Sequence, residues 1–316
     1  MRETARFQYW SMALLGLTVL VILWGAFVRV TGSGAGCADH WPLCNGELVP
    51  RSPRVETLIE LTHRVTSSLA GLLSIGVFVA ARRGFERGSP VRKAAGAGLL
   101  LMLLEGAIGA LLVKQGLVAK NTSEARAFVV ALHLCNTFLL LGAQTLTVHF
   151  ARGGAALDLR GRTGRALVVA ALLGVALLLG ASGAVTALGD TLFPSSSLRG
   201  GLAEDLAPGA HFLVRLRVLH PLLAVIGGAI IVYVAQQLRA STRSPAVRRW
   251  AQVLTIAYAA QLGVGALNLV LLAPMPIQLM HLALADVVWV ALVLLGAHAL
   301  AAPAERAQLS LESAAS

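Results

Sequence analysis

The sequence predicts an all-α integral membrane protein with eight transmembrane helices, arranged as two tandem, pseudo-twofold-related four-helix bundles. Hydrophobic residues make up 57% of the 316 residues and charged residues only 13%, which is the composition of a chain that dissolves in a bilayer. Eight stretches of about 20 apolar residues are each long enough to cross the hydrocarbon core. The two halves also resemble each other in sequence, which is typical of an internal repeat.

The predicted spans follow one another with short connections. Basic residues begin the first span, as in a signal peptide, but its apolar stretch is too long for one and no small-residue cleavage site follows it. We therefore predict that it stays as a helix. The eight spans are residues 10–30, 57–81, 94–114, 124–150, 165–187, 210–238, 248–272 and 277–301.

Matching motifs define the repeat and the domain boundaries. Gly25-Ala26 corresponds to Gly180-Ala181, and Gly109-Ala110-Leu111 corresponds to Gly265-Ala266-Leu267, at offsets of 155 and 156 residues. With four helices in each half, the second copy enters the membrane from the same side as the first. The predicted domains are an N-terminal bundle at 1–151, a linker at 152–163, a C-terminal bundle at 164–302 and a tail at 303–316.

The distribution of cations predicts the orientation in a cell (inner) membrane. Loops on one side, together with the termini, hold 16 of the 26 lysines and arginines. Because cytoplasmic loops are enriched in these residues, both termini are predicted to be cytoplasmic, and the net charge of +11 is interpreted as a topology signal and not as nucleic-acid binding. The 16 are Arg2, Arg6, Arg82, Arg83, Arg87, Arg92, Lys93, Arg152, Arg160, Arg162, Arg165, Arg239, Arg243, Arg248, Arg249 and Arg306.

Four histidines lie at similar depths in four of these spans. The natural pairs are His63 with His133 and His220 with His281, since each half has two spans that carry a deep histidine. An iron porphyrin held between two helices takes one imidazole from each, so the pattern predicts two haem-sized sites side by side in the outer part of the membrane. A lone histidine on an apolar helix would more simply be a packed core residue.

The two sites differ in the residue one helical turn before the first histidine. Glu60 precedes His63, whereas Arg217 precedes His220. An intramembrane carboxylate beside an iron site can accept protons, while an arginine can only neutralise an anion such as a porphyrin propionate. The first site is therefore interpreted as reactive and the second as an electron carrier. The simpler role for Glu60 is an ion pair with Arg64 near the helix N-terminus.

A polar loop at residues 31–56 carries Cys37 and Cys44. On an oxidising membrane face the two thiols can form a disulfide or act as a redox-active pair. Zinc binding with His40 and Asp39 is a weaker alternative, because the loop has no second pair of close ligands.

The run GAFVRVTGSGAGCADHWPLCNG followed by IELTHR, with three later helix histidines, resembles the haem A synthase family over all but about the last dozen residues. That family oxidises the C8 methyl of haem O to a formyl group by two successive hydroxylations, giving haem A for cytochrome oxidase. The resemblance implies that Glu60 is catalytic, that the first histidine pair binds the substrate haem, and that the second binds a permanent haem b. It also implies that Cys37 and Cys44 are the family's loop pair.

The resemblance further implies a haem O synthase as partner and a membrane electron acceptor or quinone. Arg29, Arg215 and Arg217 are candidate partners of haem propionates, or arginines that reach the membrane interface. Glu105 and Asp286 are expected to make interhelical hydrogen bonds. Two other functions are weighed. A di-haem b electron carrier linked to quinol would explain the histidines but not Glu60 or the cysteine loop, and a transporter would need broken helices that the sequence lacks.

Overall fold

The computed structural model describes residues 2–302, and the predicted tail at 303–316 lies outside this range. The described chain is all-α, and eight of its helices are long and apolar enough to cross a membrane, as predicted. Most of these helices extend a few residues beyond the predicted spans. The eight helices are α1 (Arg2–Val30), α2 (Val55–Gly84), α3 (Pro90–Lys114), α4 (Glu124–Ala151), α5 (Thr163–Leu192), α7 (Phe212–Ala240), α8 (Pro245–Val270) and α9 (Met275–Ala299).

Two short helices were not predicted. A 3₁₀ turn (Ser33–Ala35) follows α1, and α6 (Leu198–Leu206) lies between α5 and α7. The sequence of α6 contains two consecutive glycines, which lower helix propensity and make the segment resemble a loop. Ser197 begins α6 by accepting a hydrogen bond from the Gly200 amide.

Serines begin most of the helices that follow short connections. The hydroxyls of Ser89, Ser123 and Ser244 each accept a hydrogen bond from a backbone amide in the first turn of α3, α4 and α8. Pro90 and Pro245 then occupy the first helical position, where the missing N–H costs nothing. Sequential helices are consequently antiparallel neighbours, which is how short connections build a bundle.

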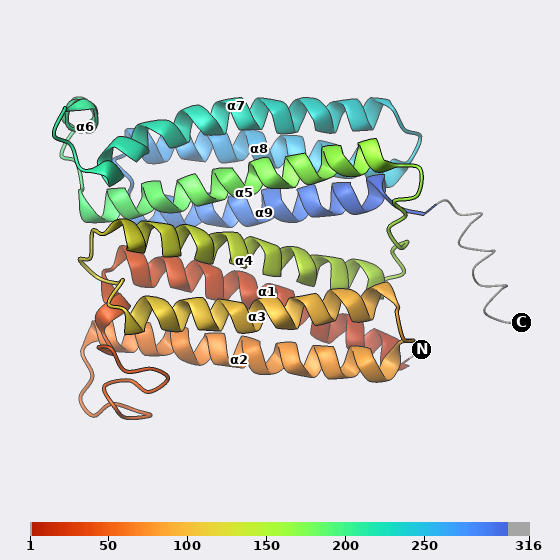
Figure 1. The fold of residues 1–316 in the computed structure, drawn as a ribbon, viewed down its shortest axis with the longest axis horizontal. Coiled ribbons are helices and arrows are strands. Elements are labelled where there is room, and N and C mark those ends of the chain that lie inside the picture. Colours follow the sequence, from red (N-terminus) through yellow and green to blue (C-terminus); the bar gives the residue numbers. More distant parts are fainter. Residues whose placement is uncertain (1, 303–316) are drawn as a thin grey trace, which may run out of the picture.

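The membrane helices pack as two groups of four (Figure 1). In the first group α1, α2, α3 and α4 form a closed ring of contacts, and in the second α5, α7, α8 and α9 do the same. We call these rings the N-terminal and C-terminal bundles. Their pseudo-twofold relation and the domain boundaries in the sequence remain predictions.

The interface between the bundles is formed by α1 and α4 on one side and α5 and α9 on the other. Because α4 and α9 are enclosed by both bundles, they are the most buried spans, at 56% and 44% of their apolar windows, against 11–22% for the others. Phe138 of α4 stacks on Trp289 of α9, with ring centroids 5.3 Å apart. Gly142 and Gly180 make room for these rings.

The two ends of the molecule differ. The start of α1 and the end of α9 lie at one end of the bundles, here called the terminal end, while the cysteine loop and α6 lie at the other, the loop end (Figure 1). The four predicted haem histidines all fall within the first ten residues of α2, α4, α7 and α9, so they lie in the half of the bundles nearer the loop end.

Candidate functional site

In each bundle the helices that carry the paired histidines lie diagonally across from each other. In the described chain α2 packs closely on α1 and α3 but not on α4, and α7 packs closely on α5 and α8 but not on α9. The imidazoles of each pair still lie within electrostatic range of each other across the bundle. The structure thus brings together His63 with His133, and His220 with His281.

A glycine on the neighbouring helix faces every one of these imidazoles. A Cβ atom at Gly25 would lie 3.0 Å from Cε1 of His63, and one at Gly183 would lie 3.0 Å from Cε1 of His220. Gly109 and Gly265 face His133 and His281 in the same way, at 4.0 and 2.9 Å. The imidazoles therefore sit against bare backbone, in a space that any other residue would narrow.

These contacts also correct the register of the repeat. The predicted counterpart of Gly25 was Gly180, but Gly180 faces Phe138, and it is Gly183 that faces the equivalent histidine. The offset is 158 residues for α1 and α5, close to the 157 residues between His63 and His220. A second Gly-Ala pair, Gly183-Ala184, made the wrong alignment possible.

The imidazole nitrogens have few partners in the described part of the protein. Nδ1 of His220 is 2.9 Å from the Ser182 hydroxyl, and Nδ1 of His133 is 3.3 Å from the Glu105 carboxylate. Among residues 2–302, Nδ1 is buried without a hydrogen bond in His63, His133 and His281, and Nε2 of His281 lies 3.3 Å from the Gln261 amide nitrogen. In His220 the hydrogen bond to Nδ1 fixes the ring and leaves Nε2 for a metal, which is the usual arrangement of a ligating histidine.

These features fit a haem in each bundle. The two imidazoles of each pair would hold the iron of a haem, which would supply redox chemistry when bound. The ligand sets themselves, His63 with His133 and His220 with His281, remain predictions.

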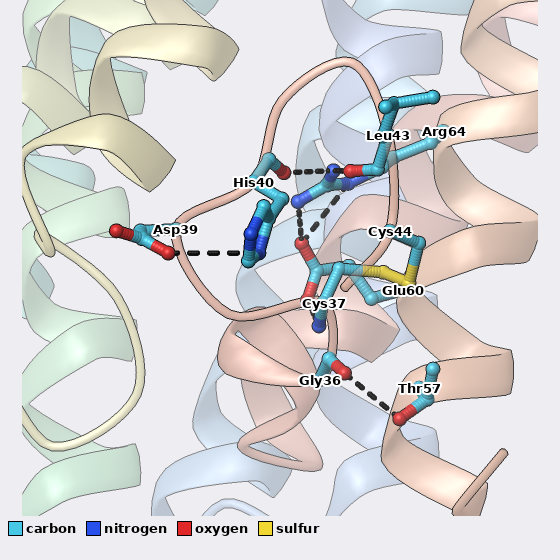
Figure 2. Close-up of polar contacts among 9 residues, drawn as sticks. All are labelled: Gly36, Cys37, Asp39, His40, Leu43, Cys44, Thr57, Glu60 and Arg64. Carbon is cyan, nitrogen blue, oxygen red and sulfur yellow. Dashed lines mark hydrogen bonds and ion pairs between the residues drawn. A yellow bond between two sulfur atoms is a disulfide. The ribbon is translucent and has the colours of Figure 1, made fainter. Parts of the chain in front are cut away.

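Glu60 is buried beneath the cysteine loop, with 3% of its surface exposed. One carboxylate oxygen accepts a hydrogen bond from the Cys37 amide at 2.8 Å, and the other accepts two from the Arg64 guanidinium (Figure 2). Arg64 also donates to the carbonyl oxygens of His40 and Leu43 at 2.6 and 2.7 Å. The ion pair expected at i+4 is therefore present, and it also connects the loop to the helix that carries His63.

Cys37 and Cys44 form a disulfide, as predicted for the loop. Both cysteines are fully buried, and the backbone of Gly36 accepts a hydrogen bond from the Thr57 hydroxyl beside them (Figure 2). Since both thiols are used in the disulfide, the zinc alternative with His40 and Asp39 does not hold in this structure. The third cysteine, Cys135, is a free thiol on α4.

Arg217 has a different environment from its counterpart Glu60. Its guanidinium forms ion pairs with Asp205 of α6 at 2.6 Å and with Asp190 of α5 at 3.6 Å, and it donates to the Phe193 carbonyl. Arg215 donates to the Pro208 carbonyl in the segment between α5 and α7. Two of the three predicted propionate partners, Arg215 and Arg217, are thus bound to this segment.

Arg29 reaches from the N-terminal bundle into the C-terminal one. It donates to the carbonyl of Ala187 at 2.5 Å and to the hydroxyl of Thr191 at 2.6 Å, both on α5, and to Gln278 of α9 at 3.1 Å. Gln278 lies three residues before His281, at the position that Glu60 and Arg217 occupy on their helices. Sequence reasoning named Arg29 but could not find these partners, which are 158 to 249 residues away.

Of the two carboxylates that were expected to make interhelical hydrogen bonds, one makes them and the other does not. Glu105 makes the expected interhelical hydrogen bonds, to Asn136 and Thr137 of α4. Asp286 does not, because both of its carboxylate oxygens are buried without a hydrogen-bond partner among the described residues. Asp286 lies five residues after His281 in an apolar core, and this position in the sequence does not reveal that it lacks the hydrogen bonds that Glu105 makes.

Comparison with known proteins gives one family. A model described as "Cytochrome oxidase assembly protein" matches residues 8–293. A protein of Thermus thermophilus called "Protoheme IX farnesyltransferase" is 48% identical over 96% of this chain, and the chain spans only 50% of that relative's length.

Two proteins called "Heme A synthase" match shorter stretches. The one from Alkalihalophilus pseudofirmus is 35% identical over 40% of each chain, and the one from Bacillus mycoides is 54% identical over 22% of each. The chain is therefore a multi-pass membrane protein that belongs to the haem A synthase family of cytochrome oxidase assembly proteins.

Proposed function

We propose that this protein is a membrane oxidoreductase that converts haem O to haem A by oxidising the C8 methyl group to a formyl group in two successive hydroxylations. The observation that carries the proposal is the buried carboxylate of Glu60, one helical turn from His63, in only one of the two paired-histidine sites. Family membership supports the same assignment.

In this proposal the N-terminal bundle holds the substrate. His63 and His133 bind the iron of haem O between α2 and α4, and each of these imidazoles lies against a glycine of a neighbouring helix. Glu60 accepts a proton released when the methyl group is oxidised, or orients the attacking water. Arg64 and the Cys37 amide hold the carboxylate in place, and preorganised charge of this kind is what stabilises a transition state.

The C-terminal bundle carries the electrons onward. His220 and His281 hold haem b, which when bound supplies one-electron redox chemistry. The Ser182 hydroxyl orients the His220 ring. The Arg217 guanidinium lies one helical turn from His220, and Asp205 and Asp190 neutralise its charge. A membrane electron acceptor or a quinone then takes the electrons.

An enzyme that attaches the farnesyl group to haem is the proposed partner. The Thermus thermophilus relative bears the name of such an enzyme, and its chain is about twice the length that matches here. A haem O synthase would supply the substrate within the bilayer. We also keep the predicted orientation, with both termini cytoplasmic in the cell membrane.

Two other functions are tested by the same experiment. The name of the Thermus thermophilus relative favours farnesyl transfer to haem, and the two histidine pairs by themselves would suit a di-haem b electron carrier. The chain is expressed with a haem O synthase in a host that lacks haem A, and the extracted haems are separated by chromatography. Haem A supports the proposal, unchanged haem O supports a carrier, and haem O formed without the synthase supports a transferase.

Glu60→Gln tests the role of the carboxylate. We expect this variant to retain bound haem but to form haem A at least about 100-fold more slowly, because a general acid–base group contributes at about that level. Glu56→Gln is the matched control, since Glu56 is an exposed glutamate one turn earlier on the same helix. Normal haem A formation by Glu60→Gln would remove the proton-acceptor role.

A further inference from the structure

The N-terminal bundle contains a small cavity in the half nearer the terminal end. All four of its helices line the cavity, and each of α1, α2 and α4 contributes polar side chains: Ser11 of α1, Ser74 of α2, and Gln144 and Thr147 of α4. Leu14, Val77, Ala95 and Gly98 complete the lining. The four polar side chains are only 2–4% exposed. The cavity therefore brings four buried polar side chains together inside a membrane-embedded bundle.

Gln144 is the unusual member of this lining. Both its amide nitrogen and its amide oxygen are buried and have no hydrogen-bond partner in the described part of the protein. A buried amide without partners costs about 1–3 kcal/mol, and the bilayer offers no water to compensate. Ser11 and Thr147 already donate to the carbonyls of Gln8 and Ala143, so their oxygens can still accept a hydrogen bond.

The cavity has the size and chemistry of a water site. The centre of a water molecule can occupy about 10 Å³ within it, roughly what one buried water needs. A buried water usually makes two to four hydrogen bonds with otherwise unpartnered polar groups. The two amide groups of Gln144 and the hydroxyls around it meet this requirement.

The C-terminal bundle is filled with apolar side chains at the same positions. The histidines and their facing glycines give offsets of 158 residues for α1, 157 for α2, 156 for α3 and 148 for α4. By these offsets the counterparts of Ser11, Ser74, Gly98, Gln144 and Thr147 are Val169, Ile231, Leu254, Leu292 and Leu295. All five are buried, at most 6% exposed, and four of them belong to one hydrophobic core cluster.

We infer that the N-terminal bundle binds water in this cavity, held by Gln144 together with Ser11, Ser74 and Thr147, and that the C-terminal bundle is dry at the same level. Glu105 lies seven residues from Gly98 along α3, about 10 Å at the helical rise, and it contacts Asn136, Thr137 and His133. The hydrated layer is thus the next polar layer below the histidine site that carries Glu60. The inference does not depend on the proposed reaction.

A high-resolution structure of the full-length protein in a lipid nanodisc tests the inference directly. We expect ordered solvent density within hydrogen-bonding distance of the Gln144 amide, and none around Leu292 in the same map. The C-terminal bundle is therefore an internal control. A closed cavity, or a Gln144 amide paired with protein groups, would overturn the inference.

A reciprocal pair of substitutions tests it in solution. Thermal unfolding in detergent is measured for Gln144→Leu and Leu292→Gln. If water satisfies Gln144, Gln144→Leu shifts the midpoint by at most a degree or two, whereas Leu292→Gln lowers it strongly or prevents folding, because no water can reach the new amide. A rise of several degrees for Gln144→Leu means that the wild-type amide is dry and unpaired, and it would overturn the inference whatever the second variant does.

Discussion

Glu60 and Arg217 occupy equivalent places, yet the protein neutralises them differently. Glu60 receives a guanidinium from its own helix and an amide from the loop, whereas Arg217 receives carboxylates from two other helices. Each buried charge is thus paired, as it must be in a low-dielectric interior. The consequence is that one site keeps a carboxylate oxygen next to its histidine and the other keeps a balanced cation.

The glycines that face the histidines give a prediction for single residues. Gly25→Ala and Gly183→Ala would each place a methyl group against an imidazole and push the ring from its position. We expect each variant to lose most of the haem from its own bundle and to keep the haem of the other, with about 1–3 kcal/mol of overpacking cost. Pyridine haemochrome spectra and haem extraction measure this.

Matched glycines on the same two helices serve as controls. Gly16 of α1 and Gly174 of α5 have open space around the position of a Cβ atom. Gly16→Ala and Gly174→Ala should therefore leave the haem content unchanged. Equal haem loss in Gly16→Ala and Gly25→Ala would show that the loss does not arise from contact with His63.

Sequence reasoning found the residues whose position along a helix is enough to reveal them. The four histidines and Glu60 could be found because the repeat and the helical spacing fix their depth and face. Gly25, Gly109 and Gly265 were named as markers of the repeat, but not as neighbours of the histidines. Gly183 carries the same signal, because its offset of 158 residues from Gly25 is close to the 157 residues between His63 and His220. The bonding of Arg64 to the His40 and Leu43 carbonyls could not, because it depends on how the loop folds back.

At the scale of elements, the cysteine loop acts as a cover that is bound to the helix beneath it. The disulfide closes the loop, the Cys37 amide bonds to Glu60, and Arg64 holds two loop carbonyls. The loop therefore contributes both its shape and its backbone contacts to the environment of the carboxylate. Opening the disulfide would weaken these contacts together.

Loss of the disulfide should make the loop accessible to protease. Closing a loop of this length contributes about 2 kcal/mol in the chain-entropy model, so the Cys37→Ala, Cys44→Ala double variant should unfold locally more often. We expect faster tryptic cleavage after Arg51 and Arg54, which are exposed in the loop, and slower haem A formation. Mass spectrometry of the fragments gives the rate.

Cys135→Ala is the control for this experiment, because Cys135 is a free thiol outside the loop. It should be cleaved at the wild-type rate. If the double variant were also cleaved at that rate, the disulfide would not be what holds the loop closed.

At the scale of the whole molecule, the boundaries of the helices were predictable and their pairing across the bundles was not. Hydropathy determines the eight spans because each must match the bilayer thickness. Which faces of α1, α4, α5 and α9 meet depends on fine packing, such as Phe138 stacking on Trp289 over Gly142. Small residues that allow close approach mark such interfaces, but they occur throughout this glycine-rich chain.

Arg29 makes a strong polar connection between the two bundles, and its removal should uncouple them. It donates hydrogen bonds to three acceptors of the C-terminal bundle, on α5 and α9. Arg29→Gln should therefore destabilise the interface by about 1–3 kcal/mol, the usual cost of losing charged hydrogen bonds. We expect a lower and broader thermal transition. Tryptophan fluorescence in detergent measures it, since tryptophans lie on helices of both bundles and Trp289 packs at the interface between them.

Two further variants separate this role from a general effect of charge. Arg29→Lys keeps the cation but loses the planar fork, so it should restore only part of the midpoint. Arg6→Gln removes an exposed arginine from the same helix and should leave the transition unchanged. The acceptors of Arg29 lie beside the second histidine pair, and Gly25, one turn away from Arg29 on α1, faces His63 of the first pair. Loss of the Arg29 hydrogen bonds should therefore also slow electron transfer between the bundles. An unaltered transition in Arg29→Gln would mean that apolar packing of α4 on α9 alone holds the two bundles together.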